Sequence, residues 1–180
     1  MEARLTDPGA LLATTHEAGG LRVRLRLARP SDAPRVHDFL RNLSPETYRR
    51  RFDAADPKSL VRHFTFYDPR RRLVVAASAP LGGRDHVVGL ADVGFAGTGL
   101  AELGVVVDDR TQNRGIGKLL TEAVASLAIQ QGASHLRGEL PGADGPILRL
   151  MERLGGTART VEEGRQVVYT TLPARRSRAA

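Results

Sequence analysis

The chain has 180 residues, of which 41% are hydrophobic, 26% are charged and none is cysteine, and its net charge is +7. This composition suits one soluble globular domain, and it excludes two large domains, wholesale disorder, disulfide frameworks, thiolate metal sites and a cysteine nucleophile. We find no apolar run of the ~20 residues that span a bilayer and no secretory signal, so we expect a cytoplasmic protein without a membrane partner. The positive charge favours an anionic partner; since only 4% of residues are aromatic, a phosphate-bearing small molecule fits better than nucleic acid.

The first half of the chain predicts one strand followed by three helices. Residues 1–20 show no sustained period, so we expect a flexible N-terminal extension before a domain at 21–173. Apolar and polar residues alternate from Leu21 to Ala28, as in a strand with one exposed face. Ser31 is predicted to cap a first helix, and Ser-Pro at 44–45 and Asp-Pro at 56–57 predict two more.

The second half predicts a meander followed by alternating strands and helices. Short strands are expected at 73–77, 87–95 and 100–107, a helix between Gly117 and Gly132, a strand at 136–140, a helix after Pro146 and a final hairpin that turns at Glu163-Gly164. Residues 174–180 carry three arginines and are expected to be a disordered basic tail. The order of elements indicates an α+β (mixed α/β) domain with one central sheet.

The strongest motif joins the strand at 100–107 to the helix that follows it. Its residues are Gln112, Asn113, Arg114, Gly115, Ile116, Gly117 and Lys118. Glycines let backbone N–H groups approach an oxygen-rich anion, and a helix N-terminus adds roughly half a positive charge. The side chains of Arg114 and Lys118 are expected to add full positive charges. The segment therefore predicts a phosphate or pyrophosphate cradle.

Two common phosphate-binding loops do not fit this motif. A Walker A loop needs a glycine five positions before its Gly-Lys and a hydroxyl residue after it, but Gln112 and Leu119 stand there. A dinucleotide fingerprint follows the first strand of a parallel unit, whereas this turn follows the last strand of a meander. The cradle must belong to another class of protein.

The pattern Gln-x-x-Gly-x-Gly after such a strand resembles the acetyl-CoA loop of the GNAT superfamily of N-acetyltransferases. The resemblance covers about residues 21–172, and it is closest to the branch that acetylates protein lysines, with the catalytic domain alone. It also rests on four further segments, at 29–33, 43–47, 101–107 and 148–155. It implies a mostly antiparallel twisted sheet of about seven strands flanked by helices, with acetyl-CoA as co-substrate.

The resemblance further implies where acetyl-CoA binds. The pantetheine arm would lie along the edge of the strand at Val105, Val106 and Val107, pairing with main-chain groups of the first and the last. The pyrophosphate would take the N–H groups from Gln112 to Gly117, which agrees with the cradle argued from the residues.

Glu102 is the candidate general base. Attack on a thioester needs a free amine, and a lysine ammonium has an unperturbed pKa near ~10.4, so some group must accept a proton. The family pattern places its base at this position. A carboxylate in an otherwise apolar strand would be partly desolvated, which raises its pKa, and Gly104 could allow a bulge that re-aims it. The alternative is a solvent-facing glutamate in a cross-strand ion pair.

The sequence departs from the family at the general acid. Many members carry Asn and, seven residues later, Tyr, but here Asp144 and Met151 stand at these positions. Tyr48, Tyr67 and Tyr169 are conceivable substitutes that fit packing roles better, so the acid is left unassigned. The leaving group is the thiol of CoA, which departs more readily than an alkoxide, so the reaction depends less on a general acid.

The remaining polar residues offer no second chemistry. The five histidines lack metal-ligand spacing, so no metal is expected. The arginine runs at 49–51 and 70–72 either steer an acidic protein substrate or form solvated surface. We expect an acetyltransferase in which a primary amine attacks acetyl-CoA directly in a ternary complex. A protein lysine is favoured as the acceptor over a small-molecule amine. The alternative function is that of a non-catalytic regulatory module that binds acyl-CoA. The sequence does not decide the oligomeric state, and a homodimer is one possibility.

Overall fold

The computed structural model describes residues 8–97, 99–140, 146–155 and 157–174. They form one eight-stranded sheet in the order β1-β2-β3-β4-β5-β6-β8-β7, in which every neighbouring pair is antiparallel except the parallel pair β5–β6. The strands are β1 Thr15–Ala18, β2 Leu21–Leu27, β3 Arg72–Leu81, β4 Arg84–Phe95, β5 Leu100–Val107, β6 His135–Leu140, β7 Thr157–Glu162 and β8 Arg165–Thr171. The helices are α1 Pro8–Ala13, α2 Ala33–Asn42, α3 Pro45–Phe52, α4 Pro57–Thr65, α5 Ile116–Gln130 and α6 Pro146–Leu154.

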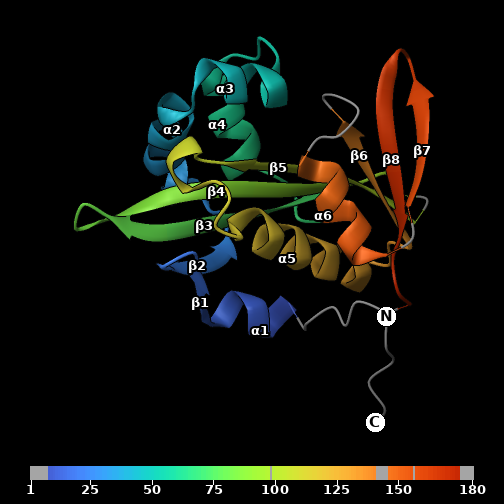
Figure 1. The fold of residues 1–180 in the computed structure, drawn as a ribbon, viewed down its shortest axis with the longest axis horizontal. Helices are drawn as coiled ribbons and strands as arrows, with labels where there is room; N and C mark the ends of the chain where they lie inside the picture. The colour runs from blue at the N-terminus through green and yellow to red at the C-terminus, as the bar shows by residue number, and fades with distance from the viewer. Residues whose placement is uncertain (1–7, 98, 141–145, 156, 175–180) are drawn as a thin grey trace.

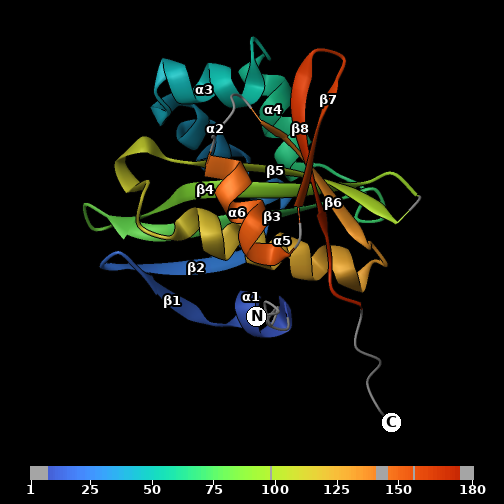
Figure 2. The same cartoon turned by 45° about the vertical axis from the view of Figure 1, so that its right-hand side comes forward.

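Helices cover both faces of the central strands (Figure 1). The helices α2, α3 and α4 lie on one face, where Val36, Phe39 and Phe64 pack against Val74, Leu90 and Val106 of the sheet. The long helix α5 lies on the other face, with α1 beside it and α6 between it and β6 and β8 (Figure 2). The predicted mixed α/β fold with a mostly antiparallel sheet is confirmed.

The three helices predicted in the first half of the chain are present, but one predicted helix cap is wrong. Ser44 caps α3 by accepting a hydrogen bond from the N–H of Thr47 at 3.1 Å, and Asp56 caps α4 through the N–H of Ser59 at 2.9 Å. Ser31, in contrast, is not a helix cap. It lies inside a short 3-10 helix at Pro30–Asp32, and α2 starts after Asp32.

Residues 8–18 correct the expectation of a flexible extension over residues 1–20. They form α1 and β1, and β1 pairs with β2 over its whole length, which makes it the eighth strand. Leu11 and Ala18 are both buried and join the core beneath α5. The segment is ordered because its few apolar residues cover the edge of the sheet, a contact that no local period reveals. Residues 1–7 and 175–180, with most of the expected tail, lie outside the described residues.

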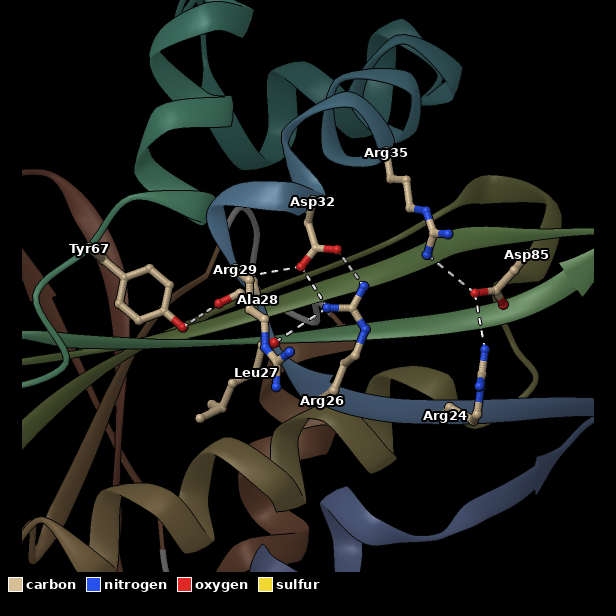
Figure 3. A network of polar contacts seen from close by, with 9 residues as sticks. All are labelled: Arg24, Arg26, Leu27, Ala28, Arg29, Asp32, Arg35, Tyr67 and Asp85. Atoms are coloured by element: carbon tan, nitrogen blue, oxygen red, sulfur yellow. Dashed lines mark hydrogen bonds and ion pairs between the residues drawn. The ribbon is translucent and has the colours of Figure 1, made fainter.

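A polar network ties the start of α2 to β2 (Figure 3). Arg26 holds Asp32 with two hydrogen bonds of 2.6 and 2.5 Å, and the N–H of Arg29 donates to the same carboxylate at 2.8 Å. The hydrogen bonds from Arg26 outweigh the effect of burial and lower the pKa of Asp32. Tyr67 donates its hydroxyl to the carbonyl of Ala28 at 2.8 Å. These contacts fix the entry of the helical layer on the sheet.

The sheet opens between β5 and β6. The two strands pair only from Leu100 to Leu103 on β5 and from His135 to Gly138 on β6, whereas β4 stays paired with β5 as far as Val107. Beyond Leu103 the outer edge of β5 has no strand partner among the residues described. In the part of the chain that the structure describes, none of the helices has the length and apolar composition needed to span a membrane.

Candidate active site

A cleft of about 1250 Å³ lies where β5 and β6 separate. One wall comes from α3 and α4, the opposite wall from α6 and the tip of the β7–β8 hairpin, and the floor from β5 and the turn into α5. Nine of the ten residues predicted to bind acetyl-CoA line it: Val105, Val106, Val107, Gln112, Asn113, Gly115, Ile116, Gly117 and Lys118. Glu102 lies in the same cleft. The fold thus gathers the proposed base and the proposed cradle at one opening.

The turn into α5 has the backbone of a cradle. Asn113 and Gly115 both have positive φ, of 59° and 91°, and Gly115 directly precedes the first turn of α5. A Cβ built on Gly115 would meet no atom within 4 Å, so the space in front of this residue is open. A helix N-terminus with an open approach offers its N–H groups and the positive end of the helix dipole to an anion.

Two side chains of the turn have other partners. Gln112 donates its side-chain amide to the carbonyl of Val107 at 3.1 Å, which ties the turn to the end of β5. Arg114 was expected to add positive charge to the cradle, but it does not line the cleft. Its guanidinium donates to the carbonyl of Gly19 at 2.6 Å, and its side chain packs where a Cβ on Gly19 would lie. Arg114 therefore anchors the β1–β2 turn instead.

Glu102 occupies the predicted position in a different environment from the one expected. Its side chain is 62% exposed and accepts a hydrogen bond of 2.6 Å from Arg137, its neighbour on β6. The expected desolvation is therefore wrong, and the cross-strand ion pair of the alternative is what the structure contains. The carboxylate remains accessible from the cleft.

Arg137 binds three carboxylates from three strands. Its guanidinium contacts Glu102, Glu139 at 3.5 Å and Glu162 at 3.0 Å. Burial opposes its charge, but the hydrogen bond to Glu162 and the surrounding carboxylates outweigh burial and raise the pKa of Arg137. The result is a permanent cation that holds Glu102 in place.

A buried carboxylate, Asp92, was not predicted from the sequence; its partner on β5 is Gly104, two residues from Glu102. Asp92 of β4 is 7% exposed, and three groups surround it: Arg51 from α3 at 2.8 Å, His63 from α4 at 3.3 Å and Arg72 from β3 at 3.6 Å. Burial opposes ionisation, yet the hydrogen bond from His63 and the two arginine charges prevail and lower the pKa of Asp92. All four side chains line the cleft. An acidic residue inside the apolar run at 87–95 was the available signal, because buried acids need cationic partners.

Gly104 makes room for this cluster. The register between β4 and β5 runs without a shift through the pair Asp92–Gly104, so the predicted bulge is absent. A Cβ at this position would lie 1.7 Å from Nη2 of Arg51 and 2.7 Å from Oδ1 of Asp92. The glycine is there because a guanidinium occupies the space of its side chain.

A family model described as acetyltransferase (GNAT) family matches residues 37–155, which include α3, α4, the meander, the turn at 112–118 and α6. The chain belongs to this family. No protein of curated function matches it.

Solved structures of the GNAT fold resemble the chain over most of its length. The GNAT domain of S. lividans PAT is 25% identical with a TM-score of 0.75, and the match covers 88% of this chain and 96% of that one. A cAMP-binding acyltransferase from Mycobacterium smegmatis is 22% identical with a TM-score of 0.61, and its match covers 88% of this chain but only 47% of the other. PaiA N-acetyltransferase from Thermoplasma acidophilum, solved with coenzyme A, is 13% identical with a TM-score of 0.61, over 83% and 98% of the two chains.

As a GNAT protein, the chain is an acyltransferase whose co-substrate is acetyl-CoA. The site fits that molecule on two observations: the edge of β5 beyond Leu103 faces the cleft without a strand partner, and the approach to Gly115 is open. Acetyl-CoA supplies an acetyl thioester when bound. The backbone of Val105 to Val107 would hold its arm, and the turn at 112–117 would hold its phosphates.

The GNAT position that often carries a tyrosine is filled here by Met151, which is fully buried. None of the three tyrosines lines the cleft. Tyr48 and Tyr67 donate to the carbonyls of Ala55 and Ala28, and Tyr169 donates to Glu162 at 2.5 Å. No tyrosine is therefore placed as a general acid, and Asp144 lies outside the described residues. Within the described ranges, no group of three or more acidic or histidine side chains could hold a metal ion.

Proposed function

We propose that the protein transfers the acetyl group of acetyl-CoA to a primary amine, a lysine side chain of a protein in the first instance, with Glu102 as general base. The observation that carries the proposal is the position of Glu102 at the mouth of the opening between β5 and β6, in one cleft with the turn at 112–118. The lysine acceptor is supported by the family segments at 29–33 and 43–47 and by the similarity to the GNAT domain of S. lividans PAT.

The reaction is a direct attack in a ternary complex. Glu102 takes a proton from the acceptor ammonium and passes it to solvent. The free amine nitrogen then forms a bond to the acetyl carbonyl carbon while a backbone N–H of the strand, near Val105, stabilises the oxyanion. The C–S bond breaks, the second proton of the attacking nitrogen goes to the departing sulfur, and the products are an acetamide and free CoA thiol.

The exposure of Glu102 is compatible with this role because a base must reach its substrate. Arg137 holds the carboxylate at 2.6 Å and is itself held by Glu162 and Glu139, so the position of Glu102 is fixed before the acceptor arrives. Transfer of the proton to solvent is open along the exposed side of Glu102.

The test combines calorimetry with a thiol-release assay. Acetyl-CoA is titrated into the wild-type protein, and release of CoA thiol is then followed with lysine-bearing proteins, lysine peptides and small amines. Glu102→Gln should keep the affinity for acetyl-CoA and lower turnover at least about tenfold at neutral pH. The matched control is Glu152→Gln, which changes an exposed acid of α6 that pairs with Arg159 outside the cleft, and it should keep turnover.

Three outcomes count against the proposal. Wild-type turnover in Glu102→Gln removes Glu102 from the mechanism. Release with small amines only makes the protein a small-molecule acetyltransferase. Tight binding without release for any amine favours the non-catalytic acyl-CoA module.

A further inference from the structure

Two arginines in the cleft have hydrogen-bonding capacity that the protein does not use. The side chain of Arg72 makes no hydrogen bond with any described residue, and its one ion pair, from Nε to Asp92, is 3.6 Å long. Arg51 uses only Nη2, toward Asp92. Both Nε atoms are buried without a hydrogen-bond partner in the described part of the chain, that of Arg72 facing Asp92 in the long ion pair, whereas the side chains of Arg72 and Arg51 are 35% and 31% exposed. The exposed parts of both guanidinium groups therefore offer N–H donors to a ligand in the cleft.

The charge of this cluster points to an anion. Two guanidinium groups share the single carboxylate of Asp92, so the cluster is positive when His63 is neutral. Glu102, the next acid along the sheet, already has Arg137 as its cation. A planar guanidinium with two free N–H groups matches a carboxylate in a paired geometry.

The sheet leaves a space between this cluster and Glu102. Arg72, Gly94 and Glu102 are direct neighbours on β3, β4 and β5, on the face covered by α3 and α4. Gly94 has no side chain, and Nη2 of Arg72 lies 3.9 Å from where its Cβ would be. The guanidinium thus lies beside Gly94, whose partner on the neighbouring strand β5 is Glu102.

We propose that Arg72 and Arg51 form a carboxylate subsite, and that the acceptor carries a carboxylate a short distance from the amine that is acetylated. The inference rests on the proposed function and specifies its substrate. The carboxylate would bind over Gly94 while the amine faces Glu102 on the neighbouring strand. Two sources share this chemistry: a free amino acid, or an acidic residue beside the target lysine of a protein.

Matched acceptors distinguish the two sources. In the first arm, β-alanine and L-methionine are each compared with their amides by kcat/KM in the thiol-release assay. In the second arm, a lysine peptide flanked by glutamates is compared with one flanked by glutamines. We expect the carboxylate partner to be preferred about 10- to 100-fold, as for a charge-assisted hydrogen-bonded pair, in the arm that matches the natural acceptor.

Substitutions of Arg72 test whether this side chain causes the preference for the carboxylate acceptor. Arg72→Gln should remove it, and Arg72→Lys should keep only part of it, because an ammonium lacks the fork of a guanidinium. The control is Arg71→Gln, which loses the same charge at the adjacent exposed residue outside the cleft and should keep the preference. Equal rates for acid and amide in both arms, or a preference that survives Arg72→Gln, would overturn the subsite.

A binding measurement separates the subsite from the proposed function. Propionate is titrated into ¹⁵N-labelled protein saturated with acetyl-CoA, and the Nε–H signals of the arginines are followed by NMR. Saturable shifts that disappear in Arg72→Gln and persist in Arg71→Gln support the subsite even if no amine is acetylated, in which case only the proposed function fails. Absence of such shifts in the wild type contradicts the subsite whatever the activity.

Discussion

The guanidinium of Arg51 on α3 occupies the place that a side chain at Gly104 on β5 would take. A Cβ there would fall 1.7 Å from Nη2 of Arg51, which donates to Asp92 at 2.8 Å. The helical layer thus contacts β5 through a charged group rather than through apolar packing alone. The glycine, the arginine and the buried acid form one unit, and a change in one should disturb the others.

Gly104→Ala should therefore destabilise the protein. The new methyl group forces Arg51 away from Asp92 and leaves a buried carboxylate with one partner fewer, which we expect to lower the free energy of unfolding by about 1–3 kcal/mol. The measurement is chemical denaturation at neutral pH. Gly94→Ala is the control, because its Cβ would meet only Nη2 of Arg72, at 3.9 Å. Equal stability of the two variants would show that Arg51 relaxes without cost.

Asp92→Asn should change the response of the protein to acid. The pKa of Asp92 is held below its ordinary value of 3.8, so its ionised form stabilises the folded state above that pH, and the contribution is lost as pH falls through the lower folded value. The variant should lose about 3 kcal/mol at pH 7, since breaking a buried pair is costly and the two arginines are about one-third exposed.

The control for this variant is its own pH profile. Unfolding is followed from pH 7 to pH 2, and the gap between wild type and Asp92→Asn should narrow below pH 4. A gap that stays constant would mean that Asp92 contributes packing rather than charge. Asp32 also has a lowered pKa, so the wild-type curve keeps part of its acid sensitivity in the variant.

Most of the fold could be predicted because its signals are local. Alternation from Leu21 onward, the pairs Ser44-Pro45 and Asp56-Pro57, and the glycine turns of the meander each act within a few residues, and each element is present. The segment at 8–18 escaped prediction because α1 has six residues and β1 has four, too few for a period. Their order depends on contacts of Leu11 and Ala18 with a core built mostly from distant residues.

In the site as well, local features could be predicted from the sequence and features that depend on distant residues could not. The turn at 112–118 was predictable because glycines, a preceding strand and a following helix are adjacent in the chain. The exposure of Glu102 was not, since it depends on where β6 leaves β5, and β6 is more than thirty residues away. The Asp92 cluster joins α3, α4, β3 and β4, and only the acid inside an apolar strand hinted at it.

Ser44 and Asp109 should show coupled effects on stability. Asp109, just after β5, accepts hydrogen bonds from the N–H and hydroxyl of Ser44, both at 2.8 Å, and from the hydroxyl of Thr47 at 2.6 Å. This contact holds the start of α3 against the segment that leads to the turn at 112–118. Ser44→Ala removes the hydroxyl hydrogen bond to Asp109 together with the helix cap, leaves the bonds from the N–H and from Thr47, and should cost about 1 kcal/mol.

A double-mutant cycle measures the coupling. Ser44→Ala and Asp109→Asn together should cost less than the sum of the single changes, by about 0.5 kcal/mol or more. Asp56→Ala is the comparison, because it removes the cap of α4, which Asp109 does not contact in the described structure, and its effect should add to that of Asp109→Asn. Additivity in both pairs would contradict a working contact between Ser44 and Asp109.

Gly115→Ala should weaken acetyl-CoA binding by straining the backbone, without a clash inside the free protein. The residue has φ of 91°, which costs an alanine about 1–2 kcal/mol, and a Cβ there would meet no atom within 4 Å. Relief of that strain would rotate the N–H groups at the start of α5, so the Kd measured by calorimetry should rise about tenfold. Gly83→Ala is the matched control, since Gly83 has φ of 79° and equally open space but lies in the β3–β4 turn outside the cleft. Both variants should lose similar stability, and only Gly115→Ala should lose affinity; an unchanged Kd would mean that the cradle does not depend on this backbone geometry.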